Sequence, residues 1–332
     1  MQWGYTCSSE EHPVRDLVRY ASLAEDAGFE FVTVSDHFHP WIQNQGHSPF
    51  AWSTIAAIAT WTSRVRMGTG VTCPLIRTHP AIIAHASATS AELSGGRFFL
   101  GVGSGEALNE HITGAAWPSI ETRHEMLAEA VDVIRQLWTG ETVDFVGEHY
   151  RVDNARLFDP PSEPPPIVCA AAGEHAAELA ARIGDAMWVT SPKADVISAY
   201  RDAGGTGDVI GQLTICYDAD REQAVATAYR VWPTSAVPGQ LMQDLPTWTH
   251  FEQACELVTP EMVAEQIPCG ADTEAVVRAA QTFADAGVTA LHIHQVGPDQ
   301  DGFFRWWRAE LGAALADMGA KVAAGPHPDP AG

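Results

Sequence analysis

The stretch 31-FVTVSDHFHPW-41 begins with four residues typical of a buried strand and ends in an acid, two histidines, a proline and a tryptophan. Such a concentration of titratable and aromatic side chains directly after a strand has three interpretations. The residues hold a metal, they perform proton chemistry on a bound substrate, or they only cap and pack. The same order of hydrophobic run, polar or small residues and helical pattern recurs along the chain.

Eight strand patterns occur in this way, each followed by a helical pattern. Alternation of strand and helix predicts a parallel sheet, and eight units in 332 residues predict an α/β fold closed as a (β/α)8 TIM barrel. No G-x-G-x-x-G follows the first strand, which argues against a dinucleotide-binding fold. The active site of such a barrel lies at the carboxyl ends of its strands. The predicted strands are residues 2–7, 31–35, 65–71, 97–103, 167–171, 186–190, 210–217 and 290–295.

Two segments interrupt the alternation. Residues 142–165 contain short strands and end in a proline-rich run, which indicates an insertion. Residues 233–258 show no clear pattern and are predicted to form a loop or lid. We expect one domain over residues 1–320, with a last helix to about residue 319 and a flexible tail over 321–332.

Composition restricts the class of partner. The net charge is −23, from 19 Lys and Arg against 42 Asp and Glu, which disfavours nucleic acid and acidic membranes. No apolar run reaches the length of a transmembrane helix, and six scattered cysteines without a C-x-x-C pair are typical of reduced thiols. We therefore expect a cytoplasmic protein that acts on a small molecule.

The first candidate cluster is 36-DHFHPW-41. His37 and His39 could share a metal, because alternate residues of a strand point the same way. Strands five and six end in Ala171 and Thr190 with no histidine to complete the ligand set, so we predict no metal. The plainest interpretation is that Asp36 caps a helix and His37 is simply hydrogen-bonded.

Three further clusters follow later strands. The stretch 101-GVGSGEALNE-110 combines glycines that allow close approach of a ligand with Glu106, on the same rim as His37, and these two side chains could act as an acid–base pair. A Gly-rich turn with a capping glutamate is the alternative. The stretch 170-AAAGEHAA-177 is either an anion site at a helix start or an ordinary turn. The stretch 190-TSPK-193 holds one of only two lysines, which favours a ligand role.

Four stretches, 35-SDHFHPW-41, 72-TCPLIRTHPAI-82, 101-GVGSGEALNE-110 and 136-QLW-138, together resemble the deazaflavin-dependent enzymes of the luciferase-like barrel superfamily. That group includes glucose-6-phosphate dehydrogenases and a secondary alcohol dehydrogenase. The resemblance covers nearly the whole chain and implies a bacterial luciferase-like barrel. It also implies that the cofactor is coenzyme F420, an 8-hydroxy-5-deazaflavin that carries hydride at C5.

The resemblance implies a role for each matching residue. His37 would exchange a proton with the substrate hydroxyl, and Trp41 would orient and shield the intermediate. Glu106 would act near N1 of the ring, and Glu10 would be a second carboxylate near the substrate. Contacts with the deazaflavin ring and its phosphate-bearing tail are implied for Asp36, Gly70, Val71, Cys73, Ser104, Gly105, Asn109, Ala172, Gly173, His175 and Ala176, with a cis peptide between Gly70 and Val71.

The substrate is expected to differ from that of the sugar-phosphate enzymes, which the resemblance credits with three phosphate-binding cations. Lys193 with Thr190 is retained, but Glu265 and Thr289 stand at the other two positions. The stretches 36-DHFHPW-41 and 72-TCPLIR-77 also favour the alcohol dehydrogenase branch. We therefore expect hydride transfer with an unphosphorylated alcohol, ketone or aldehyde, and poor activity on glucose 6-phosphate.

Several alternatives remain open from the sequence. They are an F420-dependent sugar-phosphate dehydrogenase, a flavin-mononucleotide (FMN) monooxygenase of the same superfamily, a metal hydrolase, and a carrier that binds deazaflavin without catalysis. Because members of the superfamily commonly pair through barrel helices, the resemblance also implies a homodimer.

Overall fold

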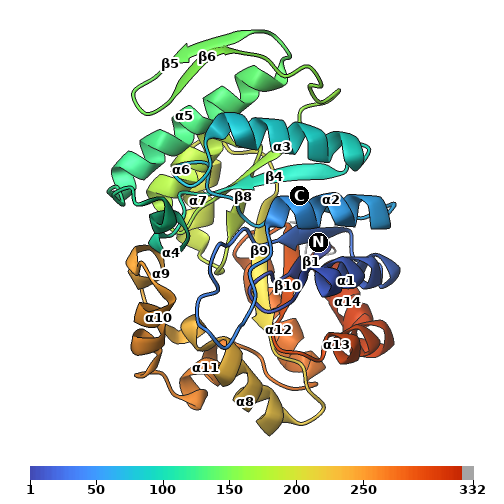
Figure 1. Ribbon diagram of the computed structural model, residues 1–332. Coiled ribbons are helices and arrows are strands. Elements are labelled where there is room, and N and C mark those ends of the chain that lie inside the picture. The colour runs from blue at the N-terminus through green and yellow to red at the C-terminus, as the bar shows by residue number, and fades with distance from the viewer. Residues whose placement is uncertain (324–332) are drawn as a thin grey trace, which may run out of the picture.

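Eight parallel strands form a closed barrel in the computed structural model, which describes residues 1–323 (Figure 1). Their order around the barrel is β1-β10-β9-β8-β7-β4-β3-β2, so that the first and last barrel strands are neighbours. The predicted (β/α)8 architecture is therefore confirmed. The barrel strands are β1 (Gln2–Cys7), β2 (Phe31–Val34), β3 (Arg66–Thr69), β4 (Phe98–Val102), β7 (Ile167–Ala170), β8 (Ala186–Val189), β9 (Val209–Ile215) and β10 (Ala290–Gln295).

Helices cover the outside of the barrel, and several begin where local chemistry predicts. At the start of α3, Pro80 occupies the first turn and the His79 ring accepts a hydrogen bond from the Ala81 N–H. None of the helices within residues 1–323 is long and apolar enough to span a bilayer. The longer helices are α1 (Val14–Asp26), α2 (Ala51–Trp61), α3 (Pro80–Leu93), α5 (Ile120–Trp138), α6 (Glu174–Ile183), α7 (Ala194–Asp202), α8 (Arg221–Val231), α12 (Thr273–Asp285), α13 (Gln300–Trp306) and α14 (Gly312–Ala323).

Aromatic and aliphatic side chains fill the interior of the barrel. Gly4 and Gly68 make room for two of them: a Cβ at Gly4 would lie 2.3 Å from the Phe31 ring, and one at Gly68 would lie 2.4 Å from the Phe99 ring. The barrel is thus a packed core and not a pore, and ligands are confined to its mouth. The interior cluster consists of Phe31, Phe99, Val168, Ala186, Trp188, Ile210 and Ala290.

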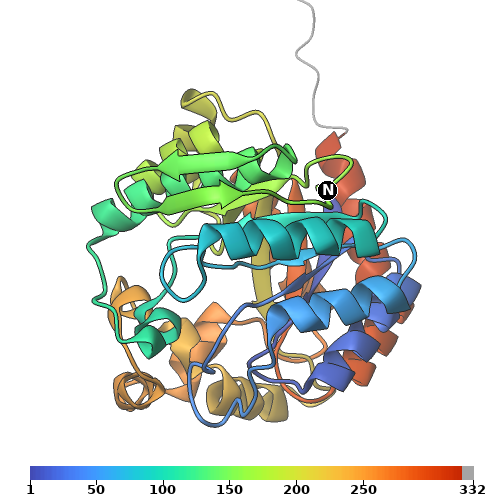
Figure 2. The same cartoon turned by 45° about the horizontal axis from the view of Figure 1, so that its top comes forward.

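The predicted insertion 142–165 contains a two-stranded antiparallel sheet, β5 (Val143–Val146) and β6 (Arg151–Ala155). Figures 1 and 2 show this hairpin outside the barrel helices, alongside α5. Between the two strands, the Tyr150 hydroxyl donates to the carbonyl oxygens of Pro74 and Leu75 at 3.3 and 3.0 Å. The hairpin therefore supports the loop that follows β3.

Two predictions about local structure were wrong. Residues 233–258 are not a patternless loop, because they contain a 3₁₀ turn (Pro233–Ala236) and helices α9 (Leu241–Asp244) and α10 (Trp248–Cys255), followed by α11 (Pro260–Gln266). These helices are too short to show a helical repeat in the sequence. The Gly-rich stretch after β4 also forms a short helix, α4 (Ala107–Glu110), extended by a 3₁₀ turn (His111–Thr113).

The last helix was predicted to end near residue 319. Its first part, α13, instead passes through a π-helical turn (Trp307–Leu311) into α14, which ends at Ala323. Residues 321–323 are therefore helical, and the rest of the predicted tail lies outside the described residues.

Candidate active site

The predicted site residues all follow the carboxyl ends of barrel strands. Glu10 follows β1, His37 follows β2, Cys73 follows β3, Glu106 follows β4 and Lys193 follows β8. Because the strands are parallel and the barrel is closed, these ends form a single rim. The fold alone therefore brings the side chains to one mouth.

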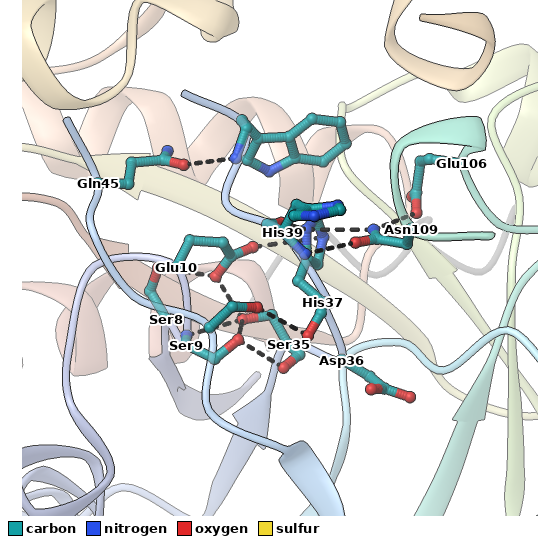
Figure 3. A network of polar contacts seen from close by, with 12 residues as sticks. Ser8, Ser9, Glu10, Ser35, Asp36, His37, His39, Gln45, Glu106 and Asn109 are labelled. Atoms are coloured by element: carbon teal, nitrogen blue, oxygen red, sulfur yellow. Dashed lines mark hydrogen bonds and ion pairs between the residues drawn. The ribbon is translucent and has the colours of Figure 1, made fainter. Parts of the chain in front are cut away.

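A buried carboxylate and an imidazole face each other on this rim. Glu10 Oε1 lies 3.4 Å from His37 Nε2, and Glu10 Oε2 accepts hydrogen bonds from the hydroxyls of Ser35 at 2.5 Å and Ser8 at 3.1 Å (Figure 3). Burial would raise the pKa of Glu10, but the His37 imidazole and the Ser35 hydroxyl outweigh it and hold the pKa below its usual value. Glu10 is therefore an anion placed against His37.

The amide of Asn109 joins His37 to Glu106. Its Nδ2 lies 3.2 Å from His37 Nδ1 and donates to Glu106 Oε2 at 3.3 Å. Its Oδ1 accepts from the backbone N–H groups of Phe38 at 2.9 Å and His39 at 3.3 Å, which fixes the orientation of the amide. Figure 3 shows Glu10 and Glu106 approaching His37 from opposite sides. The predicted acid–base pair thus shares one network.

Trp41 forms an aromatic wall beside His37. The two rings meet edge to face with centroids 4.8 Å apart, and the far side of Trp41 packs at 5.1 Å on Phe251, which is fully buried in α10. The backbone N–H of Trp41 donates to the side-chain oxygen of Gln45, whose amide nitrogen in turn donates to the Val231 carbonyl at the end of α8. The segment 233–258 therefore covers the tryptophan side of the mouth.

A buried ion cluster lies behind the network and was missed from the sequence. Arg77 Nη2 lies 3.0 Å from Asp36 Oδ1, and Arg77 Nε lies 3.5 Å from Glu110 Oε1. Thr72 donates to the other oxygen of Asp36. Burial raises the pKa of Glu110 to about 7, against the lowering effect of Arg77. The only sequence signal was a lone arginine in the otherwise uncharged stretch 72-TCPLIRTHPAI-82.

Small residues shape the rim after β3, β4 and β7. The peptide bond between Gly70 and Val71 is cis, as the resemblance implies. A Cβ added at Gly103 would lie 2.9 Å from Val71 Cγ2 and 3.4 Å from Ala170 Cβ. Gly105 has a φ of +75°, and a Cβ there would lie 2.4 Å from the sulfur of Cys73. Neither position has room for a side chain, because both glycines pack closely against their neighbours.

Burial explains the state of Cys73. Burial, with Glu110 nearby, raises the pKa of its thiol well above the usual value, so Cys73 presents a neutral surface. Ser104, two residues after β4, is half-buried.

The predicted tail-binding residues lie at the start of α6. Ala172, Gly173 and His175 are exposed there, Ala176 is half-buried, and a Cβ at Gly173 would meet no atom within 4 Å. Lys193 reaches this turn, since its Nζ donates to the Ala172 carbonyl at 3.3 Å. Thr190 is also exposed on the same rim. The residues predicted to contact the cofactor tail and those predicted to contact the substrate are therefore neighbours.

Thr289 does not belong to this mouth. It precedes β10 at the amino end of the strand, where its hydroxyl donates to Asp208 and accepts from the Val209 N–H. The expectation that Thr289 replaces a phosphate-binding cation was therefore wrong. Glu265 is exposed on α11, within the helical segment after β9. The match of Thr289 to a phosphate-binding position failed because the short helices after residue 233 show no periodic pattern by which residues could be aligned.

The two histidines of 36-DHFHPW-41 do not converge on a common point. His37 Nε2 faces Glu10, whereas His39 Nδ1 lies 3.3 Å from the Leu108 carbonyl and its ring stacks on His111. Within residues 1–323, no group of three or more His, Cys, Asp or Glu side chains is arranged to hold a metal ion.

Known proteins resemble this chain over most of its length. The family model described as luciferase-like monooxygenase matches residues 1–290. An F420-dependent glucose-6-phosphate dehydrogenase of Tsukamurella paurometabola is 36% identical over 96% of this chain and 99% of its own. One of Segniliparus rotundus is 37% identical over 95% and 98%.

A solved structure shows the same similarity in three dimensions. An F420-dependent secondary alcohol dehydrogenase in complex with an F420-acetone adduct superimposes with a TM-score of 0.87 and 30% identity, covering 95% of this chain and 98% of the other. The predicted resemblance is thereby confirmed. The chain belongs to the luciferase-like monooxygenase family, within which its relatives include enzymes named F420-dependent dehydrogenases.

Proposed function

We propose that this protein is an F420-dependent oxidoreductase that transfers hydride between the deazaflavin and a substrate alcohol or carbonyl group. The observation that carries the proposal is the network in which His37 is held between two carboxylates, Glu10 directly and Glu106 through Asn109. Oxidation of an alcohol needs a base for the hydroxyl proton, and reduction of a carbonyl needs the corresponding acid. The names of the relatives supply the cofactor.

The proton chemistry follows from the partners of the His37 ring. Nδ1 lies between a donor, Asn109 Nδ2, and an acceptor, the His39 carbonyl at 3.1 Å, so either tautomer of the ring finds a partner. Nε2 is then the atom that exchanges a proton with the substrate oxygen. The ionised Glu10 at 3.4 Å stabilises the positively charged ring that results. Trp41 excludes water from one face of this imidazole.

The rim fits a flat cofactor beside His37. Val71, Ser104 and Gly105 are small, partly exposed residues on the rim, and the exposed start of α6 offers backbone N–H groups to an anionic tail. These residues, together with Glu106, would hold F420, which supplies a hydride acceptor and donor when bound. The Asp36 carboxylate, predicted to contact the ring, is instead buried against Thr72 and Arg77.

The relatives favour a sugar phosphate over the unphosphorylated substrate expected from the sequence. The relatives from both organisms are named glucose-6-phosphate dehydrogenases, and the argument from Thr289 no longer holds. Lys193 remains as an exposed cation on the rim. The structural relative, an alcohol dehydrogenase, supports the uncharged alternative. We propose glucose 6-phosphate as the first substrate to test and a simple secondary alcohol as the second.

The experiment is an anaerobic titration of the purified protein with F420, followed by absorbance at 420 nm with glucose 6-phosphate, glucose and 2-propanol. A fall in absorbance at 420 nm with glucose 6-phosphate but not with glucose would support the sugar phosphate. The KM for glucose 6-phosphate should then rise in Lys193→Ala. Bleaching with 2-propanol alone would support the uncharged alcohol. Bound FMN with oxygen-dependent turnover, or F420 binding without turnover of any alcohol or ketone, would refute the proposal.

A further inference from the structure

Arg77 connects the two segments that carry the acid–base residues. Its guanidinium reaches the segment after β2 twice, at the side chain of Asp36 (3.0 Å) and at the backbone carbonyl of the same residue (3.1 Å). On its other side it faces Glu110 at 3.5 Å, in the short helix α4. The backbone N–H of Arg77 also donates to Glu110 at 2.6 Å. One side chain thus spans both segments.

These contacts lie next to the reactive groups in the sequence. Asp36 immediately precedes His37, and Glu110 immediately follows Asn109, one turn of chain after Glu106. Any shift between the two segments would change the distances from the Asn109 amide to His37 and to Glu106, which are 3.2 and 3.3 Å. We propose that Arg77 is a positioning residue that fixes the separation between His37 and Glu106, and this rests in part on the function proposed above.

The chemistry of the cluster explains why arginine suits this position. The side chains of Asp36, Arg77 and Glu110 are 3%, 10% and 0% exposed, so solvent does little to screen their interaction. The guanidinium donates a hydrogen bond to the Asp36 carbonyl and forms ion pairs, without hydrogen-bond geometry, with the two carboxylates. Its charge is spread over a rigid planar group that can face both carboxylates, whereas a lysine ammonium is a single point on a flexible stem. Lysine could therefore keep one of the two carboxylates but would not hold both in the same geometry.

The clamp that Arg77 forms between Asp36 and Glu110 can be measured without the cofactor. The backbone N–H groups of Phe38 and His39 are both held by Asn109 Oδ1, at 2.9 and 3.3 Å. These bonds join the same two segments that Arg77 joins, and Phe38 itself is exposed. If the clamp loosens, these amides should exchange their hydrogens with solvent faster.

Arg97 offers a matched control at the other end of the barrel. It precedes β4 at the amino end, and its guanidinium donates to the carbonyl oxygens of Ser94, Val65, Ala59 and Thr62. Arg97→Lys therefore weakens a partly buried arginine network without touching the mouth.

Hydrogen exchange of the ligand-free protein tests the clamp itself. In Arg77→Lys and Arg77→Gln, peptides that contain Phe38 and His39 should exchange at least about fivefold faster, while Arg97→Lys leaves them unchanged. Unchanged exchange in both Arg77 variants would overturn the proposal. If both variants fail to fold while Arg97→Lys folds, Arg77 is a determinant of folding and the proposal is equally wrong.

Steady-state kinetics with F420 test the consequence. A displacement of about 1 Å in a catalytic group costs roughly 10²-fold in rate, so kcat should fall by about 10- to 100-fold in Arg77→Gln, with a much smaller change in KM. Arg97→Lys should retain the wild-type kcat. Equal kcat in all three proteins would refute the positioning role. A wild-type protein without turnover would instead refute the proposed function, because exchange would still report on the clamp.

Discussion

Replacement of Glu110 by glutamine tests the energetics of the buried ion cluster. Burial raises the pKa of Glu110 from the usual 4.5 to about 7, with Glu106 and Asp36 adding to the rise and Arg77 opposing it. The folded protein therefore holds a proton on Glu110 at pH values where the unfolded chain has lost it. The unfolding free energy of the wild type should fall as the pH rises from 4.5 through 7, by roughly 3 kcal/mol from this group.

Glutamine cannot ionise, but it keeps an oxygen that can accept from the Arg77 N–H. Relative to the wild type, Glu110→Gln should therefore be nearly unchanged in stability at pH 4 and more stable by up to about 3 kcal/mol at pH 8. Denaturant unfolding of both proteins at several pH values measures this difference and cancels the other titrating groups. A difference that stays constant between pH 4 and pH 8 would contradict the assignment of Glu110 as a largely protonated carboxyl in weakly acidic solution.

Glu10→Gln is the matched control, because the pKa of Glu10 is shifted in the opposite direction to that of Glu110. The pKa of Glu10 is lowered, so its carboxylate contributes stability that is present above the usual glutamate pKa and lost as the pH falls. Glu10→Gln should therefore lose stability relative to the wild type at pH 8 and recover it in acid. Two carboxylates within one site should thus give opposite trends.

Two further variants test other parts of the site. His37→Ala should lower kcat by roughly 10²–10⁴ while F420 affinity stays within about threefold, since the ring exchanges a proton and does not anchor the cofactor; fluorescence titration and initial rates measure both, and unchanged turnover would exclude the proton role. Phe251→Ala removes a fully buried ring from behind Trp41 and should lower the unfolding free energy by roughly 3–5 kcal/mol; a loss below about 1 kcal/mol would show that α10 packs only loosely there.

The barrel was predictable because its signal is distributed over the whole chain. Eight hydrophobic runs, each followed by a helical pattern, specify a parallel closed sheet even when single boundaries are off by a residue or two. The same regularity predicts the place of the site, since polar residues that follow different strands must meet at one rim. His37 and Glu106 are 69 positions apart in the sequence and share a single amide partner in the fold.

The segment after β9 was not predictable in the same way. Its helices have between four and eight residues, too few for a periodic pattern, and they are held by contacts with distant residues such as that between Phe251 and Trp41. Residue equivalences drawn through this segment were correspondingly weak. Thr289 was assigned to a phosphate site, yet it lies at the amino end of the barrel.

The cluster around Arg77 shows why a supporting shell escapes a search for reactive residues. Motifs single out groups that can touch a ligand, such as His37 and Glu106, because their chemistry is recognisable. Arg77 has no such signature, and its importance appears only when Asp36 and Glu110 are found on either side of it. His37 and Glu106, which must exchange protons with bound ligands, need a fixed separation more than they need a further charge nearby. We therefore expect substitutions behind the network to affect turnover more than substitutions of the exposed residues that line the start of α6.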